Sequence, residues 1–179
     1  MSSARVSVIM NCLNTGEFLK EAIDSVFAQT CEDWEIIFWD NGSTDSSAEI
    51  AKSYGPKVRY FFSEITHPLG KARNLAMEQA QGEYIAFLDC DDIWLPEKLE
   101  KQVHLLDKNP ETALVFTDVI YFNADSEICQ IYLKFKPSRG EIFKELFRKY
   151  FICMSSVAIR TSAIKGLPWF DEKMKLSED

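Results

Sequence analysis

The chain has 179 residues, which is enough for one domain of about 150 residues and a fragment of a second. Hydrophobic residues make up 46% of the chain and can fill a core, which argues against intrinsic disorder. Asp and Glu outnumber Lys and Arg by 28 to 20, and the net charge of −8 argues against a nucleic-acid binder because it would repel a phosphate backbone.

Short apolar segments alternate with helical periodicity over the first 118 residues. Apolar residues recur at helical spacing across 18–27 and 95–106. Ser46 and Glu49 stand in capping-box spacing, and Pro96 stands where a proline favours the first turn of a helix. The predicted strands are 6–10, 36–39, 58–62, 84–88 and 113–116. This alternation predicts an α/β fold with a mostly parallel central sheet and helices on both faces.

The pattern becomes irregular after Asp118. Residues 119–135 are expected to supply one or two further strands, and 141–150 a short amphipathic helix. Residues 157–160 are expected to form another strand.

The cysteines are odd in number, scattered, and never in CxxC spacing, which favours free thiols in a reducing compartment and hence the cytoplasm. The first ten residues lack the apolar core of a signal peptide. No apolar run approaches the ~20 residues of a spanning helix, so any membrane contact should be peripheral. The five cysteines are Cys12, Cys31, Cys90, Cys129 and Cys153.

Ligands of an open parallel sheet bind beyond the carboxyl ends of its strands, which here means residues 11–14, 40–45 and 89–92. The seven glycines form no GxG, so the dinucleotide fingerprint is absent. The one Gly-Lys pair, at 70–71, lacks the upstream glycine of a phosphate loop. A nucleotide would therefore need another means of binding.

Three carboxylates, those of Asp89, Asp91 and Asp92, follow the apolar strand 84–88 within four positions. Such close like charges repel one another, so a divalent cation would stabilise them. Carboxylate ligands favour a hard ion such as Mn²⁺ or Mg²⁺. The structural alternative is a solvated turn whose aspartates cap the helix that begins near Pro96.

Two further segments could contact a nucleotide. Asp40 follows a strand and could accept hydrogen bonds from a base edge or ribose, whereas 43–45 are better explained as a helix cap. The turn and the cap leave Asp40 without an obvious structural task. Lys71 and Arg73 stand at a helix start, where they could meet a diphosphate or base, or simply face solvent.

The segments 6–14 (VSVIMNCLN), 39–45 (WDNGSTD), 70–74 (GKARN) and 88–92 (LDCDD), in this order, resemble the inverting glycosyltransferase family 2. The resemblance covers essentially the whole chain and implies a Rossmann-like GT-A fold. It departs from the family at residues 11–14, where members usually show Pro-Thr-Tyr-Asn, and at position 41, where a second acid is common.

The resemblance implies that residues 1–118 bind a nucleotide sugar and that 119–179 form an incomplete acceptor-side part of the same domain. It implies transfer of a sugar from a UDP-linked donor, with inversion, to a hydroxyl of a saccharide, lipid-linked or protein acceptor, as in cell-wall or polysaccharide biosynthesis. A divalent cation would offset the charge on the departing diphosphate while a carboxylate removes the acceptor's proton.

Particular residues take roles by this resemblance. Asn11, Asp40 and Arg73 would contact the nucleotide, with Asp40 at the uracil edge. Asp89 would lie by the ribose and the metal. Asp91 would bind the Mn²⁺ or Mg²⁺ ion directly.

The catalytic base of the family is the aspartate of a Glu-Asp pair that follows the metal motif. The pair placed this way is Glu178-Asp179, so Asp179 is the expected base. Other acids, Asp118, Asp125 and Asp171, lack that context. A chain that ends on its own base looks truncated, and we expect it to bind nucleotide but to transfer sugar poorly.

Residues 134–149 hold six basic residues against two glutamates, and apolar residues are interleaved with them. Such a segment could lie on an anionic membrane at the cytoplasmic face, or meet a phosphorylated acceptor. A half-buried helix with a solvated basic face is the structural alternative.

Three rival functions remain to be weighed. A sugar nucleotidyltransferase needs a basic, glycine-rich loop after its first strand, but residues 11–16 have no cation before Lys20. A phospho-acceptor receiver domain needs acids after the first strand, and this chain has none there. A non-catalytic nucleotide-sugar-binding module stays open, because the expected base is terminal.

Overall fold

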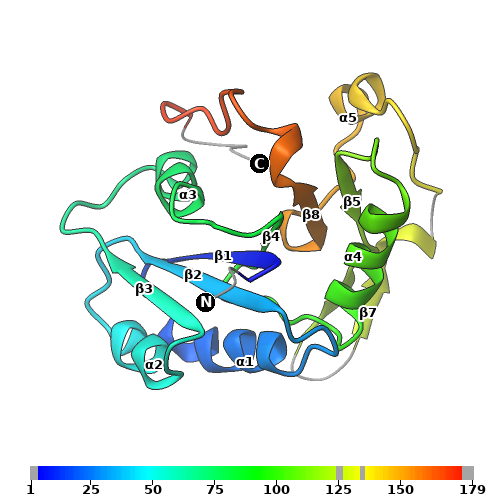
Figure 1. The fold of residues 1–179 in the computed structure, drawn as a ribbon. Coiled ribbons are helices and arrows are strands. Elements are labelled where there is room, and N and C mark those ends of the chain that lie inside the picture. The colour runs from blue at the N-terminus through cyan, green and yellow to red at the C-terminus, as the bar shows by residue number, and fades with distance from the viewer. Residues whose placement is uncertain (1–3, 124–126, 134–135, 175–179) are drawn as a thin grey trace.

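The structure is a computed structural model that describes residues 4–123, 127–133 and 136–174. Its main sheet has six strands in the order β3-β2-β1-β4-β8-β5 (Figure 1). Two of the acids considered as a base, Asp125 and Asp179, lie outside the described residues. The strands are β1 (Val6–Cys12), β2 (Trp34–Asp40), β3 (Val58–Phe62), β4 (Tyr84–Phe87), β5 (Leu114–Phe116) and β8 (Val157–Arg160).

The sheet is mostly parallel, as the sequence predicts. Strand β1 pairs in parallel with β2 and β4, and β2 pairs in parallel with β3. Strand β8 is antiparallel to both of its neighbours, β4 and β5, so β5 points in the same direction as β4. The last strand in sequence is thus inserted between two earlier ones.

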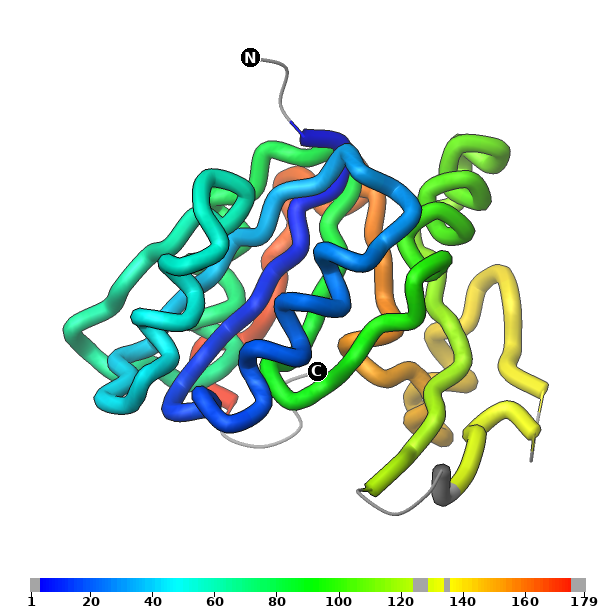
Figure 2. Tube along the Cα trace, turned by 90° about the horizontal axis from the view of Figure 1, so that it is seen from below, coloured from blue at the N-terminus to red at the C-terminus, as the bar shows by residue number. Residues whose placement is uncertain are grey.

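Helices cover both faces of the sheet. Successive strand residues point to opposite faces, so Val8 and Met10 enter one core while Ile9 enters the other. The first core also receives α1 (Gly16–Phe27), α2 (Ser47–Ser53) and α4 (Lys98–Lys108), and the second receives α3 (Leu69–Met77). Figure 2 shows α1 and α2 lying side by side along the sheet. The predicted α/β class is confirmed.

The region after Asp118 contains the predicted elements. Strands β6 (Ile120–Phe122) and β7 (Glu127–Gln130) form a separate antiparallel pair. Helix α5 (Phe143–Arg148) lies within the predicted range 141–150. Short 3-10 helices are η1 (Ile131–Leu133), η2 (Met154–Ser156) and η3 (Thr161–Ala163). No helix in the described part of the chain is long and apolar enough to span a membrane.

One detail of each of two predicted helix starts is wrong. Ser46 precedes α2 but makes no side-chain capping bond, so the capping box is not formed. Asp45 caps the helix instead, as predicted for the segment 43–45: one oxygen accepts the Ser47 N–H at 3.0 Å and the other accepts the Gly16 N–H at 2.9 Å. Asp45 thereby joins the starts of α2 and α1. Pro96 lies two residues before the first residue of α4 rather than inside its first turn.

Candidate nucleotide-binding site

Four of the predicted site residues, Asn11, Asp40, Asp89 and Asp91, lie at one edge of the sheet. Strands β1, β2 and β4 are parallel neighbours, so their carboxyl ends meet there, and the register places Cys12 beside Asp40. Asn11 lies one residue before the end of β1, and Asp89 and Asp91 follow β4. This is the edge at which an open parallel sheet binds its ligands.

Asp40 has a structural task, contrary to the interpretation from sequence. Its carboxylate is fully buried; one oxygen accepts the Ser43 N–H at 2.7 Å and the other accepts the Tyr60 hydroxyl at 2.6 Å. Burial, and then the bond to Asp40, raise the pKa of Tyr60 well above its usual value, so the phenol remains a donor. The carboxylate therefore closes the turn after β2 and fixes it to β3.

The two asparagines of the edge differ in their bonding. Asn41, at the position where a second acid is common in the family, donates to the His67 carbonyl at 2.9 Å and accepts the His67 N–H at 3.1 Å. Its side chain is thus fully used to hold a loop. The Asn11 side-chain N–H₂ is buried without a hydrogen-bond partner among the described residues. Such a group is costly unless a ligand or water accepts from it.

Arg73 and Asp89 are brought together from α3 and the end of β4. The Arg73 side chain is 3% exposed and donates to Asp89 Oδ1 at 3.4 Å. Its guanidinium also lies over the ring of Phe170, 5.4 Å from the centroid. The Asp89 side chain is 42% exposed, so it remains open to a ligand. Arg73 therefore offsets part of the negative charge of Asp89, a role that the sequence pattern indicated only for a divalent cation.

The three clustered carboxylates separate in the fold. Ser155 Oγ accepts the Asp89 backbone N–H at 3.1 Å. Burial, opposed by the Ser155 hydroxyl and aided by the nearby Asp91 charge, raises the pKa of Asp92 above its ordinary value. Asp91 is exposed. Asp92 is therefore engaged inward, which leaves Asp89 and Asp91 as the accessible acids.

A metal ion would fit this pair only with help from a ligand. Among the described residues, no group of three or more His, Cys, Asp or Glu side chains could hold an ion. Asp89 and Asp91 offer carboxylate oxygens, the donor type that Mg²⁺ and Mn²⁺ prefer, and phosphate oxygens and water commonly complete such a shell. The chemistry of the donor set thus suits a hard ion that arrives with a phosphorylated ligand.

The motif at 70–74 holds a distant segment of the chain, which the sequence did not indicate. Asn74 donates to the Phe170 carbonyl at 3.0 Å and accepts the Phe170 N–H at 3.1 Å. A Cβ on Gly70 would lie 2.8 Å from the Asp171 carbonyl oxygen, so glycine is what permits this approach. Lys71, expected to meet phosphate, pairs with Glu172 at 3.5 Å. The residues before 175 are thus fastened to the start of α3.

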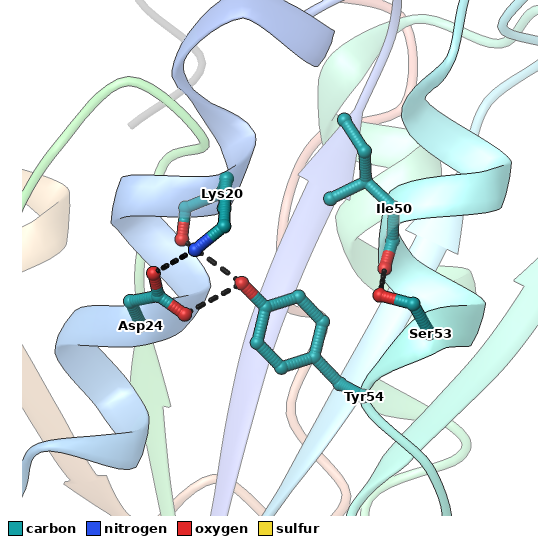
Figure 3. A pocket seen from close by; sticks show the side chains of 5 residues that line it. All are labelled: Lys20, Asp24, Ile50, Ser53 and Tyr54. Atoms are coloured by element: carbon teal, nitrogen blue, oxygen red, sulfur yellow. Dashed lines mark hydrogen bonds and ion pairs between the residues drawn. The ribbon is translucent and has the colours of Figure 1, made fainter.

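A depression of about 410 Å³ lies elsewhere, between α1 and α2. Figure 3 shows three of its polar side chains pointing toward one another. Asp24 binds Lys20 Nζ at 2.6 Å through one oxygen and the Tyr54 hydroxyl at 2.6 Å through the other. These polar groups bond to each other, so few of them remain available to bind a ligand in the depression.

Comparisons with known proteins identify the family of this chain. The profile of the glycosyl transferase family 2 matches residues 7–167. An uncharacterized glycosyltransferase of Methanocaldococcus jannaschii is 36% identical over 187 residues, which cover 100% of this chain and 63% of that protein. One of Rickettsia typhi is 32% identical over 184 residues, or 99% of this chain and 57% of that protein. The chain thus spans about three fifths of the length of these relatives.

Solved structures show the same fold. The S. aureus TarS 1-349 structure superimposes with a TM-score of 0.81 at 23% identity, covering 97% of this chain and 52% of that one. A mannosyltransferase of Pyrobaculum calidifontis, in complex with GDP-Man and Mn²⁺, gives a TM-score of 0.69 at 18% identity and covers 99% and 50%. With this fold and the match over residues 7–167, the chain belongs to glycosyl transferase family 2.

Proposed function

We propose that this chain binds a UDP-linked sugar, with Mn²⁺ or Mg²⁺, for inverting transfer to a hydroxyl of a saccharide, lipid-linked or protein acceptor. The observation that carries the proposal is the unpartnered Asn11 amide at the same sheet edge as the accessible acids Asp89 and Asp91. TarS has been solved in complex with UDP and with UDP-GlcNAc, and the mannosyltransferase with GDP-Man and Mn²⁺. The free thiols fit a reducing cytoplasm.

Each residue then has a defined role. Asn11 donates its free N–H to the nucleotide, while Arg73 orients Asp89 toward the ribose. Asp40 is proposed to contact the uracil edge, which requires the turn after β2 to move, because its carboxylate is fully buried and bonded to Ser43 and Tyr60. Asp91, with Asp89, holds the ion, which when bound offsets the negative charge that grows on the departing diphosphate. The proposed division at residue 118 separates this donor half from the acceptor-side part.

The base is proposed to be Asp179, which accepts the proton of the acceptor hydroxyl as its oxygen attacks the anomeric carbon opposite the diphosphate. Attack from that side inverts the configuration. Two of the alternative acids already have structural partners. Asp118 accepts backbone N–H groups of Val119 and Tyr132, and Asp171 accepts that of Lys173.

Calorimetric titration with UDP, GDP and CDP, each with and without Mn²⁺, tests the donor assignment. We expect UDP to bind best, and Mn²⁺ to strengthen its binding by roughly tenfold or more, because Asp89 and Asp91 would hold the ion, whose charge would offset that of the diphosphate. Asp91→Ala should remove the Mn²⁺ effect. Glu111→Ala, which removes an equal charge in the turn before β5, is the matched control and should retain it.

Two results would refute the assignment. One is that UDP binds no better than GDP or CDP. The other is that neither Mn²⁺ nor Asp91 alters the affinity for UDP.

We also propose that α5 lies against an anionic membrane, which would bring the site close to a lipid-linked acceptor. Ile142 and Leu146 pack against the core on the α3 side of the sheet. Phe143 and Phe147, one helical turn apart, are 80% and 86% exposed. Basic residues flank these aromatic side chains on an acidic protein, a pattern typical of helices that lie at a membrane surface. They include Lys144, Arg148 and Lys149.

Co-sedimentation with liposomes tests this surface. We expect the chain to sediment with vesicles that contain phosphatidylglycerol and not with pure phosphatidylcholine, since attraction to anionic lipid supplements burial of the aromatic rings. The double substitution of Phe143→Ser and Phe147→Ser should abolish sedimentation. Phe18→Ser, which alters a half-exposed aromatic on α1, should not. Equal sedimentation with both lipids, or an unaffected double variant, would contradict the proposal.

A further inference from the structure

The loop that carries the acids of the candidate site is held by a residue from far along the chain. We call residues 89–94, which follow β4, the acid loop. Strand β8 runs antiparallel to β4, and the register pairs Ala86 with Ala158. Continued by three positions, this register places Ser155 opposite Asp89, although the chain there forms η2 rather than a strand. The residues just before β8 therefore lie against the acid loop.

The Ser155 hydroxyl takes the place of a strand carbonyl. Leu88 donates its N–H to the Ile9 carbonyl of β1 at 3.0 Å. Because successive N–H groups of a strand point in opposite directions, the next one, that of Asp89, points toward β8. The ladder with β8 has ended at this point, since β8 begins at Val157, and Ser155 Oγ accepts the Asp89 N–H at 3.1 Å instead. This bond satisfies a backbone donor that the sheet leaves open.

The same serine holds the other end of the acid loop through its backbone. Its carbonyl accepts the Trp94 Nε1–H at 2.8 Å, and Trp94 is 4% exposed. The Trp94 backbone N–H donates to Ser25 Oγ of α1 at 3.1 Å, which fixes this end a second time. Between the two ends, the Asp92 N–H closes a turn on the Asp89 carbonyl at 3.1 Å. Asp91, which is exposed, thus stands in a loop whose two ends contact one residue.

Ser155 is itself fixed in place. It is 7% exposed and lies in η2, where the Ser156 hydroxyl donates to the Cys153 carbonyl at 2.6 Å and closes the turn. The Ser156 carbonyl accepts Gln102 Nε2 of α4 at 2.8 Å, which ties the turn to a helix in the first core. A turn held in this way restrains the acid loop rather than following it.

We propose that Ser155 is a positioning residue for the divalent ion. It holds the backbone of the acid loop, so that Asp89 and Asp91 are already in place when the ion and the nucleotide arrive. Ser155 is buried and acts through Asp89 rather than as a ligand. Residues that fix the ligands of a metal commonly change its affinity by roughly tenfold or more when they are substituted. This inference rests on the proposed function, in which those two acids hold Mn²⁺ or Mg²⁺.

Amide hydrogen exchange tests whether the hydroxyl holds the loop, and it needs neither ion nor nucleotide. In Ser155→Ala the Asp89 N–H loses its acceptor, and we expect it to exchange roughly tenfold faster or more. Ser156→Ala is the matched control, because it removes the same atom from the next residue and leaves the bond to Asp89 intact. Exchange at Asp89 should be unchanged in this control. Unchanged exchange in Ser155→Ala, or equal acceleration in both variants, overturns the proposal.

Calorimetric titration of the same variants with UDP, with and without Mn²⁺, tests the role in ion binding. We expect Ser155→Ala to bind UDP alone as the wild type does, but to lose most of the roughly tenfold gain in affinity from Mn²⁺. Ser156→Ala should keep that gain.

A merely structural loss would weaken UDP binding equally with and without Mn²⁺. That result, or a full Mn²⁺ effect in Ser155→Ala, overturns the positioning role. If the wild type itself shows no Mn²⁺ effect, the proposed function fails instead, and exchange at the Asp89 amide still decides whether Ser155 holds the acid loop.

Discussion

Substituting Asp40 by alanine is expected to lower the free energy of unfolding by about 2–4 kcal/mol and to abolish UDP binding. The buried carboxylate accepts the Ser43 N–H and the Tyr60 hydroxyl, and each buried donor left without a partner costs about 1–3 kcal/mol. Without these bonds, the turn after β2 also loses its connection to β3. Urea denaturation and calorimetry measure the two effects.

Two matched variants separate the structural task of Asp40 from base recognition. Tyr60→Phe removes only the hydroxyl donor but leaves one oxygen of the buried carboxylate without it, so it should cost about 1–3 kcal/mol with UDP binding retained. Asp40→Asn keeps an acceptor for the Ser43 N–H, so the fold should persist. Loss of the UDP preference in that variant supports contact with the uracil edge. An Asp40→Ala protein as stable as the wild type would contradict the structural task.

Gly70→Ala is expected to detach residues 170–174 from α3. The added Cβ would lie 2.8 Å from the Asp171 carbonyl oxygen. Alanine is otherwise favoured over glycine in a helix by about 1 kcal/mol, so any loss of stability in this variant would report that clash. Hydrogen exchange at the Phe170 amide, which donates to Asn74, should become much faster. If Asp179 is the base, sugar transfer should fall while UDP binding is retained.

A second variant tests the contact between α3 and Phe170 without a steric clash. Asn74→Ala removes both bonds to the Phe170 backbone and should accelerate the same amide. Asn109→Ala, which removes an amide that donates to the Leu105 carbonyl at the end of α4, is the control and should leave that exchange unchanged. Slow exchange at Phe170 in both the Gly70 and the Asn74 variants would show that this contact does not hold the segment.

The local structure of this chain was predictable where it depends on short stretches of sequence. Strands 58–62 and 157–160 match their predicted bounds, because β-branched and apolar residues are concentrated there. The position of β8 between β4 and β5 was not predicted, because it depends on pairings such as Ala86 with Ala158, far apart in the chain. The start of α4 was misplaced, because proline is also common just before a helix.

The site was predictable in its motif residues and not in their partners. Asn11, Asp40 and Asp89 stand at strand ends, and a parallel sheet brings such ends together. Tyr60, Ser155 and Phe170 belong to no motif, and only the tertiary fold places them against Asp40, Asp89 and Arg73. The role of Asp179 stays a prediction.

Lys98 is another residue whose surroundings could not be predicted from the sequence. In sequence it is one of three lysines of a charged helix. In the fold it is buried over the ring of Trp94, 3.9 Å from the centroid, and burial lowers its pKa to about 7. No periodicity distinguishes such a lysine from a solvated one.

The late insertion of β8 has a consequence for biosynthesis. Until residues 157–160 leave the ribosome, one edge of the buried strand β4 has no partner. At roughly 5–20 residues per second, the interval between translation of Phe87 and Arg160 lasts on the order of 4–15 s. Unpaired edges of apolar strands recruit other chains, so nascent molecules are prone to aggregate during that interval, and translational pausing before codon 157 would prolong their dependence on chaperones.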